Sequence, residues 1–121
     1  MVATARFFLD TYAMIEIIRG NPGYRKYVDG EFATLYTNLL ELYHALLRDF
    51  DAMIAGRYLE VYRPHLVPLD LEWIAPAAEL KLRRKVSYGD ALGYVAARSL
   101  DLPFLTGDDA FRGEPGVEFV K

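Results

Sequence analysis

Residues 87–111, SYGDALGYVAARSLDLPFLTGDDAF, decide the fold of this 121-residue chain. The first half predicts a helix capped by Ser87, because a serine hydroxyl accepts a free backbone N–H of the first turn. Pro103 then opens a short apolar segment, PFLTG, that is typical of a buried strand. This stretch therefore places one carboxylate, Asp90, in the first turn of a helix and another, Asp108, just beyond the end of a strand.

The same alternation of strands and helices runs through the rest of the chain. Apolar or β-forming segments predict strands at 5–9, 32–37, 66–69 and 117–120. Apolar residues at helical spacing and capping residues predict helices over 11–19, 24–28, 38–50, 51–62 and from 70 to about 85. Strands separated by helices favour right-handed crossovers, so we expect one α/β domain with a mostly parallel sheet over residues 1–121.

Four acidic residues occupy equivalent places in this pattern. Asp10 and Asp108 follow predicted strands, whereas Glu41 and Asp90 lie in the first turns of predicted helices. Ligands of parallel sheets bind beyond the carboxyl ends of the strands, so we expect all four acids on one side of the molecule. Singly, each also has a structural explanation: a helix cap for Asp10 or Asp90, a turn for Asp108, and a solvated helix face for Glu41.

Convergent carboxylates predict a metal site. Two carboxylates about 4 Å apart repel by roughly 4 kcal/mol at an effective dielectric constant near 20, so four of them require protons or cations. Oxygen ligands without cysteine favour Mg²⁺ or Mn²⁺, which can hold a phosphodiester and activate a water. Thr106 is expected to orient a metal-bound carboxylate or water without binding the metal itself. The same is expected of Asn38 and Ser87, unless they are fully engaged as helix caps.

Composition narrows the class of protein. The chain has no cysteine, which excludes disulfides and thiolate metal sites and suits a reducing cytoplasm. No apolar run approaches the roughly 18 residues of a membrane span, and the first ten residues do not resemble a secretory signal. The sequence also lacks GxGxxG, GxxxxGK and HExxH motifs and a serine nucleophile elbow, so it gives no support to those enzyme classes.

Basic residues provide candidate contacts to a nucleic acid. Because the net charge is −3, a nucleic-acid ligand needs a local basic patch or bound cations. The densest basic run consists of Lys81, Arg83, Arg84 and Lys85. Arg112 follows shortly after the acidic residues Asp108 and Asp109. We predict that these residues contact the phosphates of a nucleic acid, with a solvated helix end as the alternative for the run; the candidates are Arg83, Arg84, Lys85 and Arg112.

Motifs spread over nearly the whole chain resemble the PIN domain family, most closely its VapC-type toxin branch. They are FFLDTYAMIEII at 7–18, NLLELYHAL at 38–46, SYGDALGYVAA at 87–97 and LPFLTGDDAF at 102–111. By alignment of these motifs, the acidic residues of the family correspond to Asp10, Glu41, Asp90 and Asp108. Asp109 departs from the family, in which this position is often basic, and is interpreted either as an extra metal ligand or as a solvated residue.

The resemblance implies a three-layer α/β/α fold and a metal-dependent endoribonuclease whose products carry 5′-phosphate and 3′-hydroxyl ends. Asp10, Asp90 and Asp108 would hold Mg²⁺ or Mn²⁺, and Glu41 would complete the site directly or through a water. A homodimer and a small antitoxin partner are also implied. Two alternatives stay open: an RNA-processing PIN nuclease without an antitoxin, and an inactive PIN module that only binds a partner protein.

Overall fold

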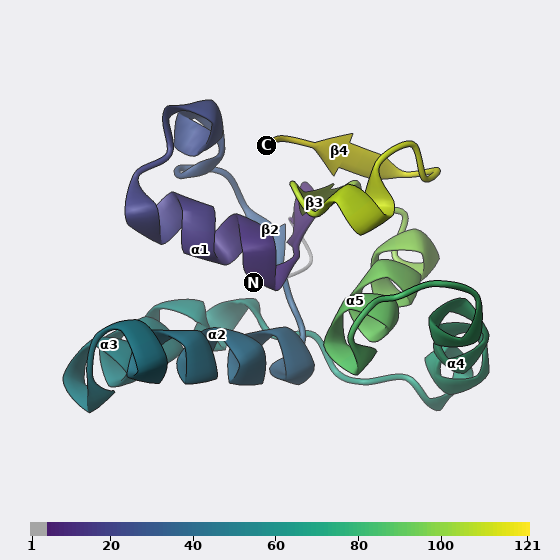
Figure 1. The fold of residues 1–121 in the computed structure, drawn as a ribbon, viewed down its shortest axis with the longest axis horizontal. Coiled ribbons are helices and arrows are strands. Elements are labelled where there is room, and N and C mark those ends of the chain that lie inside the picture. Colours follow the sequence, from purple (N-terminus) through teal and green to yellow (C-terminus); the bar gives the residue numbers. More distant parts are fainter. Residues whose placement is uncertain (1–4) are drawn as a thin grey trace.

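A four-stranded sheet forms the centre of the computed structural model, which describes residues 5–121 (Figure 1). Residues 1–4 of the predicted domain lie outside the described part. The strands are β1 (Phe7–Leu9), β2 (Phe32–Ala33), β3 (Phe104–Thr106) and β4 (Val117–Phe119). They lie in the order β2-β1-β3-β4 and all pairs are parallel, which confirms the predicted α/β class.

Helices connect these strands in the expected manner. Helix α1 (Thr11–Arg19) and the 3₁₀ helix η2 (Pro22–Tyr27) lead from β1 to β2. Between β2 and β3 lie α2 (Tyr36–Asp49), α3 (Ala52–Tyr62), η3 (Arg63–His65), η4 (Leu71–Trp73), α4 (Ile74–Arg83) and α5 (Tyr88–Ser99), and η5 (Asp109–Phe111) precedes β4. Within residues 5–121, none of the helices has the length and apolar character needed to cross a membrane.

Two apolar clusters on opposite faces of the sheet give the molecule three layers. Phe8 and Phe104 pack on the face covered by α4 and α5. Leu9 and Leu105 pack on the other face, with residues of α1, α2 and α3. This division follows from the two-residue repeat of a strand, which turns successive side chains to opposite faces. Figure 1 shows the two groups of helices on the left and right of the central strands.

The strand order creates a topological switch between β1 and β3. From β1 the chain moves to β2 on one side, and it later returns to β3 on the other. The N–H of Asp10 donates to the carbonyl of Leu105 at 3.1 Å, which holds the two strand ends together. Asp10 and Asp108 follow these two strands, so two predicted acids lie where open α/β sheets bind their ligands.

The predicted strand at 66–69 is wrong. Only Leu66 pairs with the sheet, through an isolated bridge to Thr34. Thr34 donates its N–H to the carbonyl of His65 at 3.0 Å and accepts the N–H of Val67 at 3.0 Å. The partner segment becomes helix α2 at Tyr36, so no strand lies beside residues 68 and 69 to continue the ladder of hydrogen bonds.

The predicted boundary between strand 32–37 and the next helix is also wrong. The strand ends at Ala33, and α2 begins at Tyr36, before Asn38. Asn38 is therefore not the helix cap that the sequence suggested; it is completely buried inside α2. Glu41 accordingly lies in the second turn of the helix rather than the first. The β-forming residues of this segment were a weak guide, because packing overrides local preference.

Candidate metal centre

Asp10 lies directly after β1 and is completely buried. The hydroxyl of Thr106, at the end of β3, donates to Oδ2 of Asp10 at 2.7 Å. Oδ1 of Asp10 is buried without a hydrogen-bond partner among the described residues. Asp10 makes no capping hydrogen bond to α1, so the capping explanation for this residue fails. A buried carboxyl with a free oxygen indicates a binding role, because unsatisfied buried polar atoms are costly.

Asp90 meets Asp10 from the first turn of α5. Ser87 caps this helix as predicted, with its hydroxyl accepting the backbone N–H of Asp90 at 2.9 Å. The carboxyl groups of Asp10 and Asp90 lie within hydrogen-bonding reach of each other, and this contact raises the pKa of Asp10 and lowers that of Asp90. Burial, and then the negative charge of Asp90, raises the pKa of Asp10 well above its usual range. Asp10 is therefore the member of this pair that binds a proton more readily.

Asp90 interacts electrostatically with the two remaining acids, Asp108 and Glu41. Burial raises the pKa of Asp90; the hydrogen bond from Asp10 lowers it and the charge of Asp108 raises it. Burial also raises the pKa of Glu41, a hydrogen bond from Ser87 lowers it, and the charge of Asp90 adds to the increase. The charges of these acids thus act on one another, and each makes ionisation of its neighbour less favourable. Protons or cations are needed to balance it.

Glu41 reaches this centre from α2, although its spacing in the sequence favours a solvated face. The hydroxyl of Thr11 donates to Oε1 of Glu41 at 3.1 Å. A methyl group at Gly89 would lie 2.8 Å from the carboxyl atoms of Glu41, so the missing side chain lets α5 approach α2. Sequence reasoning missed Thr11 and Gly89. A glycine in the first turn of a predicted helix, next to Asp90, is a signal that could have identified the close approach.

Asn38 acts behind the site and not as a cap. The hydroxyl of Thr11 donates to the backbone carbonyl of Asn38 at 3.1 Å, and Nδ2 of Asn38 lies 3.4 Å from that hydroxyl. Oδ1 of Asn38 has no partner within the described part of the chain. A methyl group at Gly93 would come within 3.0 Å of it. Asn38 thus supports Thr11, which in turn contacts Glu41.

Asp108 occupies a partly buried turn after β3. Its N–H donates to the hydroxyl of Thr106 at 3.1 Å, and its Oδ1 accepts the N–H of Ala110 at 3.0 Å. Thr106 therefore contacts two of the four acids through one hydroxyl: it donates to Asp10 and accepts from Asp108. This shared contact fixes the ends of β1 and β3 relative to each other.

Asp109 differs from Asp108 in its surroundings. Its exposed side chain forms ion pairs with Arg112 at 2.9 Å and with Lys121 at 3.2 Å. The hydrogen bond from Arg112, followed by that from Lys121, lowers the pKa of Asp109. The guanidinium of Arg112 also lies 4.2 Å from the ring centre of Phe119. These contacts favour the solvated interpretation of Asp109 over a role as an additional ligand.

The chemistry of the acids fits a divalent cation. They offer only oxygen donors, Oδ1 of Asp10 is buried without a partner, and burial raises the pKa of three of them. Within residues 5–121, however, no three His, Cys, Asp or Glu side chains gather closely enough to hold a metal as they stand. The acids meet as pairs instead. A cation offsets the repulsion between carboxylates, so it would let a third one approach.

Three of the predicted RNA contacts border a hollow of about 480 Å³. It lies beside the turn that contains Asp108 and Asp109, which we call the acidic turn. Its lining consists of Arg83, Arg84, Lys85 and Ala110. Arg84 donates to the carbonyl of Ala110 at 2.9 Å and forms an ion pair with Glu114. Arg83 and Lys85 are exposed and form no ion pair with the described residues. Residues 83–85 thus contain two side chains available to a ligand and one, Arg84, that the protein itself engages.

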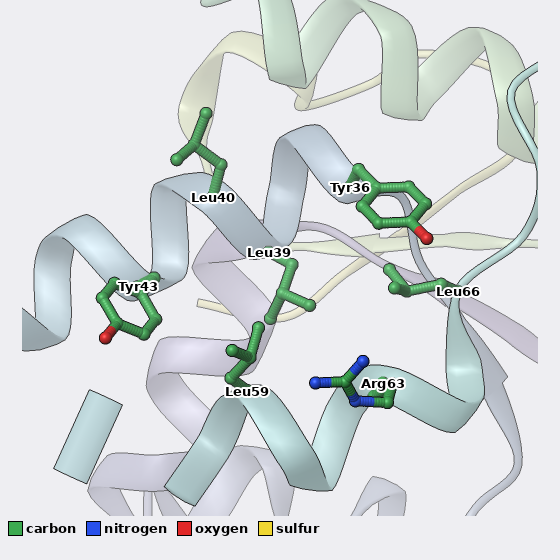
Figure 2. A pocket seen from close by; sticks show the side chains of 7 residues that line it. All are labelled: Tyr36, Leu39, Leu40, Tyr43, Leu59, Arg63 and Leu66. Carbon is green, nitrogen blue, oxygen red and sulfur yellow. The ribbon is translucent and has the colours of Figure 1, made fainter. Parts of the chain in front are cut away.

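A separate, mainly apolar hollow of about 510 Å³ lies between α2 and α3 (Figure 2). Figure 2 shows Leu39 of α2 and Leu59 of α3 pointing toward each other, with Arg63 beside them. The lining residues are Tyr36, Leu39, Leu40, Tyr43, Leu59, Arg63 and Leu66. None of the four acids is among these described residues, so this hollow is distinct from the acidic centre.

The structure is a three-layer α/β/α domain with acidic residues at the topological switch point of its sheet. Comparison with models of protein families identifies the family to which it belongs. The family model described as PIN domain matches residues 7–113, and the chain belongs to this family. Proteins of the PIN family are nucleases and generally use divalent metal ions. No curated protein sequence matches the chain.

Solved toxin structures share the fold. VapC20 from Mycobacterium tuberculosis, described as a Sarcin-Ricin loop cleaving toxin, has a TM-score of 0.80 and 16% identity over 95% of this chain and 99% of its own. A toxin–antitoxin complex from Klebsiella pneumoniae has a TM-score of 0.72 and 16% identity over 92% and 94% of the two chains. DNA-bound VapBC from Salmonella typhimurium has a TM-score of 0.71 and 18% identity over 95% and 96%. The TM-scores show that the fold is shared, and at such low sequence identity the similarity extends to the fold alone.

Proposed function

We propose that this PIN domain is a Mg²⁺- or Mn²⁺-dependent endoribonuclease and the toxin of a toxin–antitoxin pair. The observation that carries the proposal is the carboxyl pair of Asp10, which is buried, and Asp90, which is partly buried, at the switch point. Burying two acids in contact lowers stability unless a proton or cation offsets the charge. Asp10 caps no helix in return, so its placement is best explained by a cationic ligand.

Each acid has a distinct role in this proposal. Asp10, Asp90 and Asp108 would hold the ion, and Glu41 would complete the site directly or through a water. A divalent ion supplies charge neutralisation for the phosphodiester and lowers the pKa of a bound water. Thr106 occupies Oδ2 of Asp10 and leaves Oδ1 as the available ligand atom. The protein thus orients its ligands through neighbouring hydroxyls.

Exposed cations near the acidic turn support RNA as the substrate. Arg83 and Lys85 border the hollow that also touches Ala110, two residues after Asp108. Arg112 directly follows the 3₁₀ helix η5 of the same turn. Contacts of this kind position phosphates without reading bases. They would also offset the repulsion between RNA and a chain with a net charge of −3.

The direct test is cleavage of a short single-stranded RNA by the purified protein with Mn²⁺. We expect products with 5′-phosphate and 3′-hydroxyl ends. Asp90→Asn and Asp108→Asn should each abolish cleavage and retain the fold, whereas the exposed Asp109→Asn should remain active. Undiminished cleavage by either of the first two variants would sink the assignment of these ligands.

An antitoxin partner is proposed because several proteins of the same fold were solved as toxin–antitoxin complexes. If a small protein is encoded beside the gene, its addition should inhibit RNA cleavage. Failure to inhibit would favour an RNA-processing nuclease without an antitoxin. The inactive-module alternative is less consistent with the structure, because Asp10 and Asp90 lie within hydrogen-bonding reach of each other.

A cytoplasmic homodimer completes the proposal. Apolar side chains on the surface of α2 and α3 support association of two copies; these include Tyr36, Leu40, Phe50 and Met53, each at least 60% exposed. Exposed apolar groups of this size often mark interfaces. A monomer mass by light scattering at micromolar concentration would refute the homodimer.

A further inference from the structure

Arg84 differs from its basic neighbours in what its side chain contacts. It follows the last residue of α4, and Nη1 donates to the carbonyl of Ala110 at 2.9 Å. Nη2 pairs with the carboxylate of Glu114. Arg83 and Lys85 are exposed, whereas the side chain of Arg84 is 37% exposed and that of Glu114 is 18% exposed. The guanidinium of Arg84 is therefore engaged in the protein and is not a free phosphate contact.

The contact with Ala110 leads directly to a proposed ligand of the metal. Ala110 accepts from Arg84 with its carbonyl and donates its N–H to Oδ1 of Asp108 at 3.0 Å. On the other side, the N–H of Asp108 is held by the hydroxyl of Thr106 at 3.1 Å. The acidic turn is thus held at two points. Thr106 fixes it from β3, and Arg84 fixes it from the end of α4.

Glu114 gives Arg84 a second point of contact on the same loop, beyond the turn. Its N–H donates to the carbonyl of Phe111 at 3.1 Å, and Phe111 is completely buried. Arg84 therefore bridges two points on one loop, the Ala110 carbonyl and the Glu114 carboxylate, which lie on either side of a core residue. A planar guanidinium suits such a bridge because its donors are fixed in a fork, whereas a lysine ammonium is a single point charge.

The ion pair itself adds little to overall stability, because partly exposed pairs typically contribute about 0–1 kcal/mol. Its effect is better described as geometric. Groups that hold metal ligands from behind typically change metal affinity or activity by about 10–100-fold when removed. Removal of a residue that only contacts RNA would instead weaken substrate binding and make that binding less dependent on salt.

We propose that Arg84 is a positioning residue for Asp108 in metal-dependent RNA cleavage, and not an RNA contact like Arg83 and Lys85. This inference rests on the proposed nuclease function. It assigns two roles to the basic run 83–85. The exposed side chains at each end face the substrate, and the central one holds the acidic turn.

The test compares Arg84→Ala with Arg83→Ala and Lys85→Ala in the full chain. Mn²⁺ affinity is measured by calorimetry without RNA, and kcat and KM are measured on a short single-stranded RNA. For Arg84→Ala we expect Mn²⁺ affinity and kcat to fall by about tenfold or more, with KM nearly unchanged. For the other two variants we expect a higher KM and a salt slope reduced by about 0.7, with Mn²⁺ affinity unchanged.

A second variant keeps the test decisive if Arg84→Ala does not fold. Glu114→Gln retains the shape of the side chain but removes the charge that holds the guanidinium, and it should weaken Mn²⁺ binding in the same direction. Wild-type Mn²⁺ affinity and kcat in Arg84→Ala, or wild-type Mn²⁺ affinity in a folded Glu114→Gln, would overturn the inference alone. A wild-type protein that neither binds Mn²⁺ nor cleaves RNA would overturn the proposed function as well.

Discussion

The carboxyl groups of Asp10 and Asp90 lie within hydrogen-bonding reach of each other, although one follows β1 and the other lies in the first turn of α5. Asp10 is completely buried, and burial raises its pKa, so either a proton or a cation can offset its charge. A proton and a divalent ion therefore compete for the same carboxylates. The predictions that follow use this competition and the residues that hold the acids in place.

The stability of the protein in the presence of a chelator should fall as the pH rises. Asp10, Asp90 and Glu41 have raised pKa values in the folded state, mainly because of burial, so the folded state binds more protons than the unfolded one. The free energy of unfolding should then decrease as pH rises from about 4 toward 7, since unfolded carboxyls titrate near 4. Urea unfolding with EDTA at a series of pH values measures this slope. A stability that rises with pH across this range would contradict the assignment.

Asp10→Asn should stabilise the protein while it abolishes cleavage. Asparagine keeps the shape of the side chain, can accept from Thr106 and donate to Asp90, and carries no charge. We expect the free energy of unfolding at pH 7 with EDTA to increase by roughly 1–2 kcal/mol, the size of a typical single-site effect. Asp109→Asn is the matched control, because that exposed residue should change stability little. A destabilised Asp10→Asn would show that the buried charge is already balanced within the protein.

Gly89→Ala should impair activity through Glu41. A methyl group at position 89 would lie 2.8 Å from the carboxyl atoms of Glu41 and displace them. We expect cleavage to fall by about 10–100-fold with the fold retained. Gly56→Ala in α3 is the control, because nothing lies within 4 Å of the added methyl group. In that helix the change should be neutral or stabilise by up to about 1 kcal/mol. Equal activity of the two variants would exclude close packing at Gly89 as a functional requirement.

Thr106→Val should weaken both the site and the fold. The substitution preserves shape but removes the hydroxyl that donates to Asp10 and accepts from Asp108. Because these groups are buried or partly buried, loss of the hydroxyl should cost roughly 1–3 kcal/mol of stability, measured by urea unfolding with EDTA. Mn²⁺ affinity should fall as well. Thr106→Ser, which keeps the hydroxyl, should recover most of both properties. A valine variant with wild-type stability and affinity would refute this role.

Much of the fold follows from the sequence because local rules and packing agree. The helix at 11–19 and the cap at Ser87 are present as predicted, and the parallel sheet follows from the alternation of strands and helices. The predicted strand at 66–69 is wrong because its partner segment becomes helix α2 at Tyr36 and leaves nothing to pair with residues 68 and 69. The start of α2 failed because residues 36–37, which favour strands locally, join a helix whose inner face packs on the sheet.

The candidate site was predictable in its acids but not in the contacts between them. Asp10, Asp90 and Asp108 stand out by their positions at strand and helix ends. Glu41 is different, because the spacing of apolar residues along α2 does not reveal that α5 approaches its polar face. The supporting roles of Thr11 and Gly89 depend on that approach, so they become visible only when the helices are placed in space.

The central claim, that the acids form a metal site, is tested most directly by Mn²⁺ titration of thermal stability. A ligand that binds only the folded state stabilises it by about 2.7 kcal/mol at one hundred times its dissociation constant. Mn²⁺ should raise the midpoints of the wild type and of Asp109→Asn by similar amounts and barely change that of Asp108→Asn. If Mn²⁺ leaves the wild-type midpoint unchanged, or raises that of Asp108→Asn equally, the acids do not form this metal site.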